Sequence, residues 1–204
     1  MLELSRFVPR CQRCTSEEQL HAFQRNFQHY SGNPVDLDYL QAEKTQTIAL
    51  YWRRRMIGGY VLRQGPELRY RDILIRAGGA WPEHPQTSDC AELCCSWLAH
   101  RHTLLSMLMF CDTAQRLQKL PQSYLVGGSR IPAVVAAHRP FFPYSICSTT
   151  RETQGRIERW SFYYTEARQF NAKYVALEAL RRLTQAPLRM RSNRRKTAEW
   201  APAD

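Results

Sequence analysis

The chain has 204 residues, 44% of them hydrophobic, and its 29 Lys and Arg against 18 Asp and Glu give a net charge of +11. A chain of this length and hydrophobic content can form one domain with its own core. The excess of arginine favours an anionic partner, which could be a nucleotide cofactor, an acidic carrier protein, nucleic acid or an anionic membrane. A GC-rich genome is the alternative explanation for the arginines. No apolar run approaches about 20 residues, which argues against a membrane-spanning helix, and seven cysteines with two adjacent argue against a full disulfide framework.

The first half of the chain is predicted to contain a helix and a pair of strands. Thr15 or Ser16 can cap a helix in which apolar residues recur at helical spacing from Leu20 to Tyr30, and the segment Ser31–Pro34 ends it. Alternation of apolar and polar residues then predicts strands at 46–53 and 56–63, with arginines in the turn between them. The second strand contains the pair Gly58-Gly59, which indicates a bulge or the close approach of another group to the backbone.

The second half alternates strands and helices. The short apolar run Ile73-Leu74-Ile75 is predicted to be a strand, and the Pro- and Gly-rich loop after it is a plausible cover for a binding site. The further predicted elements are a strand at 90–98, a helix at about 103–120, a strand at 123–129, a helix starting at Pro132, extended segments at 140–149 and 156–166, and a helix at 166–183. The alternation of strand, helix and strand in this half implies at least two parallel central strands.

This order of elements resembles the GNAT superfamily, in particular its branch of acyl-homoserine-lactone synthases and bacterial N-acyl amino acid synthases. The matching features are Arg25, Asp36–Tyr39, Ile57–Val61, Arg71–Leu74, Ala91–Leu93 and Tyr124–Ser129. The resemblance implies a single α/β (α+β) domain over residues 1–185, with a central mixed, twisted sheet flanked by helices, and a basic, flexible tail at 186–204. The sequence departs from the family at Ala99–Thr103, where the usual glycine-containing pyrophosphate loop is absent, and at Cys95, where lactone synthases typically have an arginine.

The resemblance also implies N-acyl transfer, and amide synthesis from a thioester needs a base for the amine, donors for the oxyanion and an acid for the leaving thiolate. Glu92 is the expected base, because a lone carboxylate within an apolar strand is desolvated and its pKa rises. A structural carboxylate paired with an arginine is the alternative. His138 and Tyr144 are the expected acids, and a histidine that only caps a helix end is the alternative for His138.

Donor contacts are expected where the central strand meets the next helix, because backbone amides at a helix start bind phosphate, here the phosphate or phosphopantetheine of a thioester. An ordinary solvated turn is the alternative. The expected donor-binding residues are Leu98, Ala99, His100, Arg101, His102, Thr103 and Ser129. Arg25 and Arg53 are expected to hold the carboxylate of the acceptor. No metal site is expected, because Cys11 and Cys14 form a single CxxC and the histidines lack a suitably spaced third ligand.

The expected reaction moves an acyl group, most simply a fatty acyl chain, from acyl carrier protein or acyl-CoA to the amine of an amino acid or small amine, with no tightly bound cofactor. The segment 181–196 has seven basic residues and no acid. It fits an acidic carrier protein or an anionic membrane surface, or is simply a solvated tail. A cytoplasmic bacterial enzyme, peripheral at the inner membrane if the tail binds lipid, is expected. The alternatives are a catalytically silent GNAT-like binding module and a basic nucleic-acid-binding protein, although no nucleic-acid module is recognisable.

Overall fold

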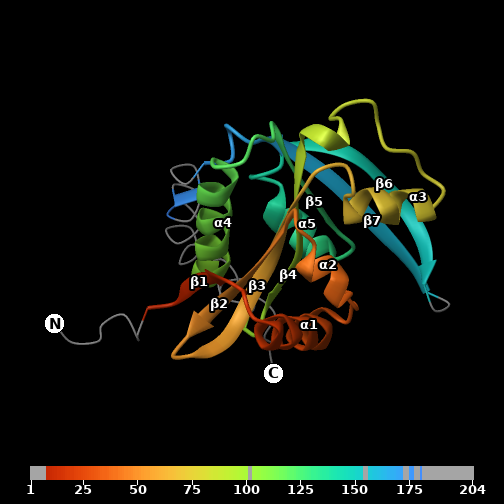
Figure 1. The fold of residues 1–204 in the computed structure, drawn as a ribbon. Coiled ribbons are helices and arrows are strands. Elements are labelled where there is room, and N and C mark those ends of the chain that lie inside the picture. The colour runs from red at the N-terminus through yellow and green to blue at the C-terminus, as the bar shows by residue number, and fades with distance from the viewer. Residues whose placement is uncertain (1–7, 101–102, 154–155, 172–174, 177–179, 181–204) are drawn as a thin grey trace, which may run out of the picture.

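The computed structural model describes residues 8–100, 103–153, 156–171, 175–176 and 180, which form a seven-stranded sheet with helices on both faces (Figure 1). The strands are β1 (Arg10–Arg13), β2 (Thr45–Trp52), β3 (Arg55–Gln64), β4 (Cys90–Leu98), β5 (Tyr124–Ser129), β6 (Tyr144–Thr153) and β7 (Arg156–Glu166). The helices are α1 (Glu17–Ser31), α2 (Leu37–Gln41), α3 (Arg69–Arg76), α4 (Thr103–Leu117) and α5 (Pro132–His138), with a 3-10 turn at Thr87–Asp89. The predicted mixed α/β domain is confirmed.

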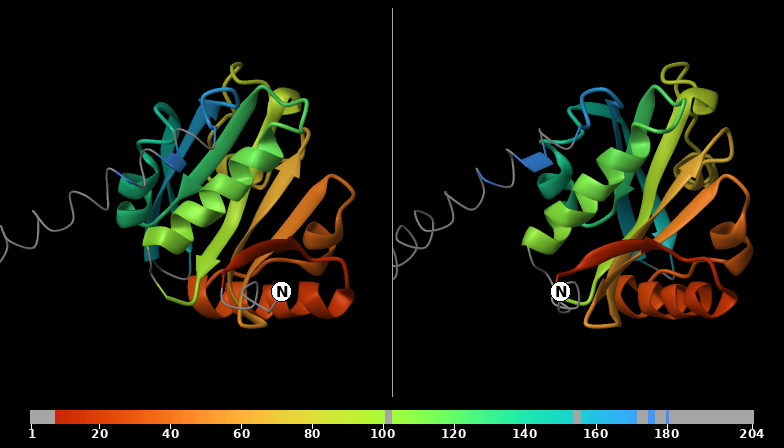
Figure 2. Two further views of the ribbon diagram at one scale, coloured as in Figure 1. Left: turned by 90° about the vertical axis from the view of Figure 1, so that its left-hand side faces the viewer. Right: turned by 60° about the vertical axis from the view of Figure 1, so that its left-hand side comes forward.

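The sheet has the order β1-β2-β3-β4-β5-β7-β6, and its two faces have separate cores. Neighbouring strands are antiparallel except β4 and β5, which are parallel. One core contains Phe23 and Phe27 of α1 together with Leu40 of α2 and Leu74 of α3, whereas α4 contributes residues such as Phe110 to the other (Figure 2). None of the described helices is both long and apolar enough to cross a membrane.

Helix α1 begins and ends where the sequence predicts. The Ser16 hydroxyl accepts a hydrogen bond from the backbone N–H of Gln19, and the Gln19 side chain accepts one from the Ser16 backbone, which is a capping box. Gly32 ends the helix in the left-handed conformation, with φ of 69°. Glycine adopts that conformation without the steric cost that other residues incur.

The hairpin of β2 and β3 is confirmed, and its turn consists of Arg53 and Arg54. Their φ angles of 48° and 64° are both positive, as in the two-residue turns whose twist matches paired strands. The pairing register shifts between Leu50 and Tyr51, and Ile57 is the additional residue on β3. The bulge expected near the glycine pair therefore lies one residue before Gly58.

Gly59 is needed because α1 packs directly on the backbone of β3. A Cβ atom at this position would lie 2.5 Å from the carbonyl oxygen of Ile48 and 2.6 Å from the ring of Phe23. Phe23 is fully buried and belongs to a core cluster. Two groups therefore approach this glycine closely: the Phe23 side chain of α1 and the Ile48 carbonyl of β2.

We expect Gly59→Val to lower the free energy of unfolding by about 1–3 kcal/mol or more, because the added methyl groups must displace Phe23 or the strand. Chemical denaturation monitored by tryptophan fluorescence measures the loss. Arg55→Val, at an exposed position of the same strand, is the matched control and should stay within about 0.5 kcal/mol of the parent. Equal stability of the Gly59 variant and the control would show that Phe23 is not held against β3.

The prediction of a strand at Ile73–Ile75 is wrong, because these residues lie in α3. Tyr70 and Leu74 are buried one helical turn apart, whereas Ile75 is 45% exposed. Three consecutive apolar residues do not distinguish a strand from a helix, and the wider i, i+4 spacing decides in favour of the helix.

The later elements agree with the sequence up to β7. The strand at 123–129, the helix that starts at Pro132 and the two final strands are confirmed, and α4 ends at Leu117. Residues 167–171 do not continue from β7 into the predicted helix. Most of the rest of that helix and the whole tail at 186–204 lie outside the described residues.

Candidate active site

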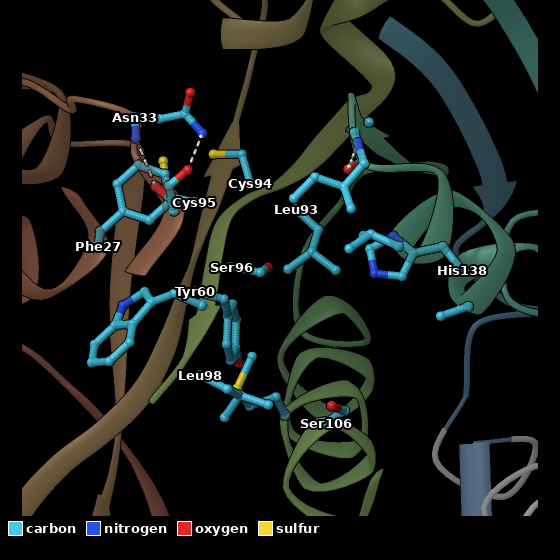
Figure 3. Close-up of a pocket in the computed structure, with 18 of the residues that line it drawn as sticks. Phe27, Asn33, Tyr60, Leu93, Cys94, Cys95, Ser96, Leu98, Ser106 and His138 are labelled. Carbon is cyan, nitrogen blue, oxygen red and sulfur yellow. Dashed lines mark hydrogen bonds between the residues drawn. The ribbon is translucent and has the colours of Figure 1, made fainter. Parts of the chain in front are cut away.

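Strands β4 and β5 pair over only three residues and then separate. Their parallel pairing begins at Cys90 with Tyr124 and ends at Glu92 with Val126. A cavity of about 480 Å³, lined by residues of both strands beyond this point, opens at their carboxyl ends (Figure 3). The volume falls in the range of about 300–1,000 Å³ that is usual for small-molecule sites.

The cavity has an apolar wall and a smaller set of polar groups. The apolar wall includes Leu93, Leu98, Met107, Met109 and Phe110. The polar groups include Ser96, Ser106, Ser129, His138 and Arg69. Flexible methionines and a phenylalanine make a lining that can adapt to an alkyl chain.

Tyr70 of α3 bridges the two strands where they separate. Its hydroxyl donates to the carbonyl oxygen of Gly128 at 2.9 Å and lies 3.2 Å from that of Leu93, a second acceptor. A Cβ on Gly128 would lie 3.2 Å from the ring of Tyr70, so the glycine leaves room for the ring. Tyr70 is 7% exposed. The separation of the strands is thus filled and hydrogen-bonded by one side chain.

Glu92 anchors the start of the helix that carries Tyr70. Its carboxylate accepts hydrogen bonds from the backbone N–H of Tyr70 at 2.6 Å, from that of Arg69 at 2.9 Å and from the hydroxyl of Tyr39 at 3.0 Å. Its burial raises its pKa, and these hydrogen bonds and the charge of Arg69 partly offset the rise. Glu92 is fully buried and does not line the cavity. The carboxylate therefore caps a helix, and its hydrogen-bond donors are two backbone amides and the Tyr39 hydroxyl, not the side chain of an arginine.

Strand β4 bulges at the wall of the cavity. Val61 pairs with Cys94 and Gly59 with Trp97, so Cys95 and Ser96 together oppose one residue of β3. Cys95 has φ of 50°, a conformation that residues other than glycine rarely adopt. Bulges of this kind release backbone groups from the ladder and occur often beside active sites.

Arg69, the first residue of α3, contacts the bulge of β4. Its Nη1 donates to Cys95 Sγ at 3.1 Å, and its Nη2 donates to the carbonyl of Pro34 at 3.0 Å. Burial raises the pKa of the Cys95 thiol, but a hydrogen bond from Cys94 and the charge of Arg69 lower it more, so the net shift is downward. A cation beside a thiol favours its thiolate form.

His138, one of the expected acids, lines the cavity from the end of α5. Its Nδ1 lies 2.6 Å from the hydroxyl of Tyr163, and its ring packs against Phe110 and Phe142. Burial raises the pKa of Tyr163, so that hydroxyl stays protonated and is available to hydrogen-bond the imidazole. Figure 3 shows His138 on the cavity wall away from Cys95, with Ser96 and Leu93 between them in the view.

The expected donor-binding residues divide into three groups. Leu98, Thr103 and Ser129 line the cavity. Ala99 and His100 follow β4 but do not line the cavity. Arg101 and His102 lie outside the described residues.

The expected acceptor-binding arginines and the second expected acid do not line the cavity. Arg25 and Arg53 are exposed on α1 and in the turn of the hairpin. Tyr144 is 40% exposed and stacks on Tyr164, with ring centroids 5.1 Å apart. Within the described part of the chain, no group of three acidic, histidine or cysteine side chains is placed to hold a metal ion.

Two cavity features were missed from the sequence. The first is the pair Arg69 and Tyr70 in α3. The helical spacing of Tyr70 and Leu74, which lie on one face, could have identified this helix from the sequence. The second is Cys95. Its signal in the sequence was weaker: it occupies a position at which lactone synthases typically have an arginine.

We expect Tyr70→Phe to lower the free energy of unfolding by about 1–3 kcal/mol, because the buried carbonyls of Gly128 and Leu93 lose their donor. Differential scanning calorimetry and urea titration measure the change. Tyr30→Phe, at a residue that is 46% exposed, is the hydroxyl-removing control and should change stability by less than about 0.5 kcal/mol. A Tyr70 variant as stable as the control would mean that the bridge does not hold the strands.

No protein-family model matches the sequence, and no curated protein matches it. Solved structures do share its fold. FeeM, an N-acyl amino acid synthase from uncultured soil microbes, superposes with a TM-score of 0.64 at 12% identity, over 80% of this chain and 93% of its own. MesI, a CoA-dependent acyl-homoserine lactone synthase, gives 0.58 at 12% identity over 83% and 95%.

An acetyl-CoA-bound structure is also similar: YncA, a putative acetyltransferase from Salmonella typhimurium, has a TM-score of 0.55 at 12% identity, over 78% of this chain and 94% of its own. Other matches include a putative acetyltransferase of the GNAT family. The chain therefore has the fold of GNAT acyltransferases, as the sequence predicts. At these identities the likeness concerns the fold.

Proposed function

We propose that this protein is an N-acyltransferase that moves an acyl group from a thioester to a primary amine. The observation that carries the proposal is the cavity at the carboxyl ends of β4 and β5, where an apolar wall adjoins the bulge at Cys95 and Ser96. Ligands of α/β sheets bind preferentially at the carboxyl ends of parallel strands. The solved neighbours named as acyltransferases support the same activity.

The donor is an acyl-CoA or acyl carrier protein thioester. Its acyl chain would lie against Met107, Met109 and Phe110, and its phosphopantetheine would leave the cavity past Leu98 and Thr103. MesI is described as CoA-dependent, and YncA was solved with acetyl-CoA, which supports CoA as one form of the donor. The acidic surface of a carrier protein would suit the net charge of +11.

The reaction needs an oxyanion site and an acid. The nitrogen of the amine attacks the thioester carbonyl, and backbone N–H groups released at the bulge would stabilise the oxygen that becomes negative. As the C–S bond breaks, His138 would donate a proton to the leaving thiolate, and the proton lost by the amine would return to its imidazole, whose ring Tyr163 orients.

The acceptor is an amino acid or a similar small amine. Arg25 and Arg53 are outside the cavity wall, so a carboxylate bound beside the thioester needs another partner. Among the described residues, the arginines on the wall are Arg69 and Arg130, and Arg130 forms an ion pair with Glu158. FeeM is described as an N-acyl amino acid synthase, and this supports an amino acid as the acceptor.

A catalytically silent binding module is the second candidate, and one observation favours it. Glu92, the expected base, is occupied by the start of α3 and does not line the cavity. One assay separates the two: the purified protein is incubated with dodecanoyl-CoA or dodecanoyl carrier protein and a mixture of amino acids, and N-acyl products are measured by mass spectrometry. Release of free thiol together with an N-acyl amine supports the enzyme, whereas donor binding without thiol release supports the silent module.

We expect His138→Ala to reduce kcat roughly 10²–10⁴-fold, because the leaving thiolate loses its acid. Tyr144→Phe is the control that compares the two acids expected from the sequence, and it should retain activity within a few-fold. Steady-state kinetics with one acyl thioester measures both variants. A larger defect in the Tyr144 variant would reverse the assignment.

We expect Glu92→Gln to lower the free energy of unfolding by about 1–3 kcal/mol, because the amide NH₂ group confronts a backbone N–H that needs an acceptor. Glu43→Gln, at an exposed position, is the control. If Glu92 instead serves only as the base, the variant keeps the stability of the parent and loses kcat alone. Thermal denaturation and kinetics on the same preparation therefore distinguish its two roles.

A further inference from the structure

The cavity is lined from both faces of the sheet. Met107 and Phe110 belong to the core to which α4 contributes, whereas Phe27 and Trp97 belong to the core on the opposite face, together with residues of α1 and α3. The cavity therefore passes through the sheet where β4 and β5 separate. Figure 3 shows Phe27 and His138 on opposite sides of the view. In the proposed reaction the acyl chain and His138 occupy the α4 side, which leaves the side of α1 and α3 for the amine.

Arg69 places a positive charge on the side of α1 and α3. Its Nη1 donates to Cys95 Sγ at 3.1 Å and its Nη2 donates to the carbonyl of Pro34 at 3.0 Å. Glu92 accepts from the backbone N–H of Arg69, and within the described residues the guanidinium forms no ion pair with a carboxylate at 4.0 Å or less. A guanidinium has five N–H donors in a planar fork that matches a carboxylate. Arg69 therefore has donors left for an anionic group in the cavity.

The indole of Trp97 supplies another donor on this side. Trp97 is 5% exposed and lines the cavity, and its Nε1 is buried without a hydrogen-bond partner among the described residues. A buried donor without a partner is costly and is usually satisfied by water or a ligand. A carboxylate has two oxygens and can accept from more than one donor. Both the cation and the unpaired N–H therefore favour a ligand that carries acceptors.

Apolar side chains form much of the rest of this side. Tyr30 stacks on Trp97 with ring centroids 5.3 Å apart and 4° between the planes, and both line the cavity together with Phe27 and Ile73. The guanidinium of Arg69 lies over the ring of Phe27, 5.9 Å from its centroid. Aromatic and branched side chains bury the apolar surface of a ligand and pair well with rings. A ligand that fits here combines an anionic group at Arg69 with a large apolar group.

We propose that the acceptor is a free α-amino acid with a large apolar side chain, whose carboxylate is held by Arg69 on the side of α1 and α3. This names the acceptor class of the proposed function and rests on it. Arg69 contacts the bulge at Cys95, so an amine one carbon atom away from the carboxylate reaches the bulge, where the thioester carbonyl binds in the proposed reaction. The neutral nitrogen attacks the carbonyl carbon, the C–N bond forms and the C–S bond breaks. His138 gives a proton to the leaving thiolate, and the proton lost by the nitrogen returns to the imidazole.

The first test compares acceptors and needs no variant. The full-length protein is given dodecanoyl-CoA with phenylalanine, phenylalaninamide or glycine, and mass spectrometry of the N-acyl products gives kcat/KM. Phenylalaninamide keeps the ring and the amine but has no negative charge, so we expect its kcat/KM to be lower by about 100-fold or more. Glycine keeps the carboxylate without the side chain, and its kcat/KM should be lower by about 10-fold or more.

Variants assign the carboxylate to Arg69. In Arg69→Gln we expect KM for phenylalanine to rise about 100-fold and the preference over the amide to fall to within a few-fold, with KM for dodecanoyl-CoA nearly unchanged. Arg76→Gln, at an exposed arginine of the same helix outside the cavity wall, is the matched control and should keep the preference. A ratio between two acceptors belongs to the active fraction of the protein, so partial misfolding does not change it. Loss of the preference in Arg130→Gln instead of Arg69→Gln would overturn the assignment.

The outcomes separate this inference from the proposed function. If phenylalaninamide is acylated as efficiently as phenylalanine, the inference fails although the N-acyltransferase stands. If glycine is used as well as phenylalanine, the apolar part of the inference fails. If no amine is acylated, the proposed function fails, and isothermal titration calorimetry decides the inference. Binding of phenylalanine that is absent with phenylalaninamide and in Arg69→Gln supports the carboxylate site, whereas equal binding or no binding overturns it.

Discussion

The site depends on the way in which α3 is tied to β4. The start of a helix leaves N–H groups without partners, and a buried carboxylate requires donors. Glu92 and the backbone of Arg69 and Tyr70 satisfy each other, and in doing so they fix where α3 begins. Tyr70 is thereby placed between the two parallel strands, and its hydroxyl serves carbonyls of both.

The cavity follows from this separation. Two parallel strands that stay paired leave no space between them, whereas β4 and β5 stop pairing after Glu92 and Val126. Where the two strands separate, backbone carbonyl groups no longer face N–H groups of the other strand and need another donor, which the Tyr70 hydroxyl supplies. Gly128 contributes by having no side chain where the ring of Tyr70 lies. One hydroxyl and one glycine thus help to maintain the opening between β4 and β5.

Different elements supply the apolar and the polar parts of the cavity wall. Helix α4 supplies apolar side chains such as Met107 and Phe110, which suit a hydrocarbon chain without directing it. The bulge of β4 and the start of α3 supply Cys95 and Arg69, where charge and hydrogen bonding are concentrated. The fold shared with FeeM at 12% identity indicates that the pattern of strands and helices persists while most of the sequence differs.

The sequence by itself determined the elements whose signals are local. A capping residue at Thr15 or Ser16 signals the start of α1, and Pro132 signals the start of α5. The alternation of β2 ends at the turn of Arg53. Each of these signals acts within a few residues. For the same reason the short run Ile73–Ile75 was ambiguous, since three residues do not carry a period. The mixed α/β domain followed from the order of these elements and from the family that they resemble.

Only the tertiary structure decided which residues meet at the site. Glu92 was correctly selected as an unusual buried carboxylate, but its partners lie 22 and 23 residues away, on a helix whose position no local pattern specifies. Arg25 and Arg53 are arginines like Arg69, yet only Arg69 reaches the cavity, because α3 begins beside β4. The contact of Arg69 with Cys95 joins residues 26 apart in the chain. Contacts of this kind depend on how helices pack on a sheet, and that geometry arises from the whole core rather than from any one segment.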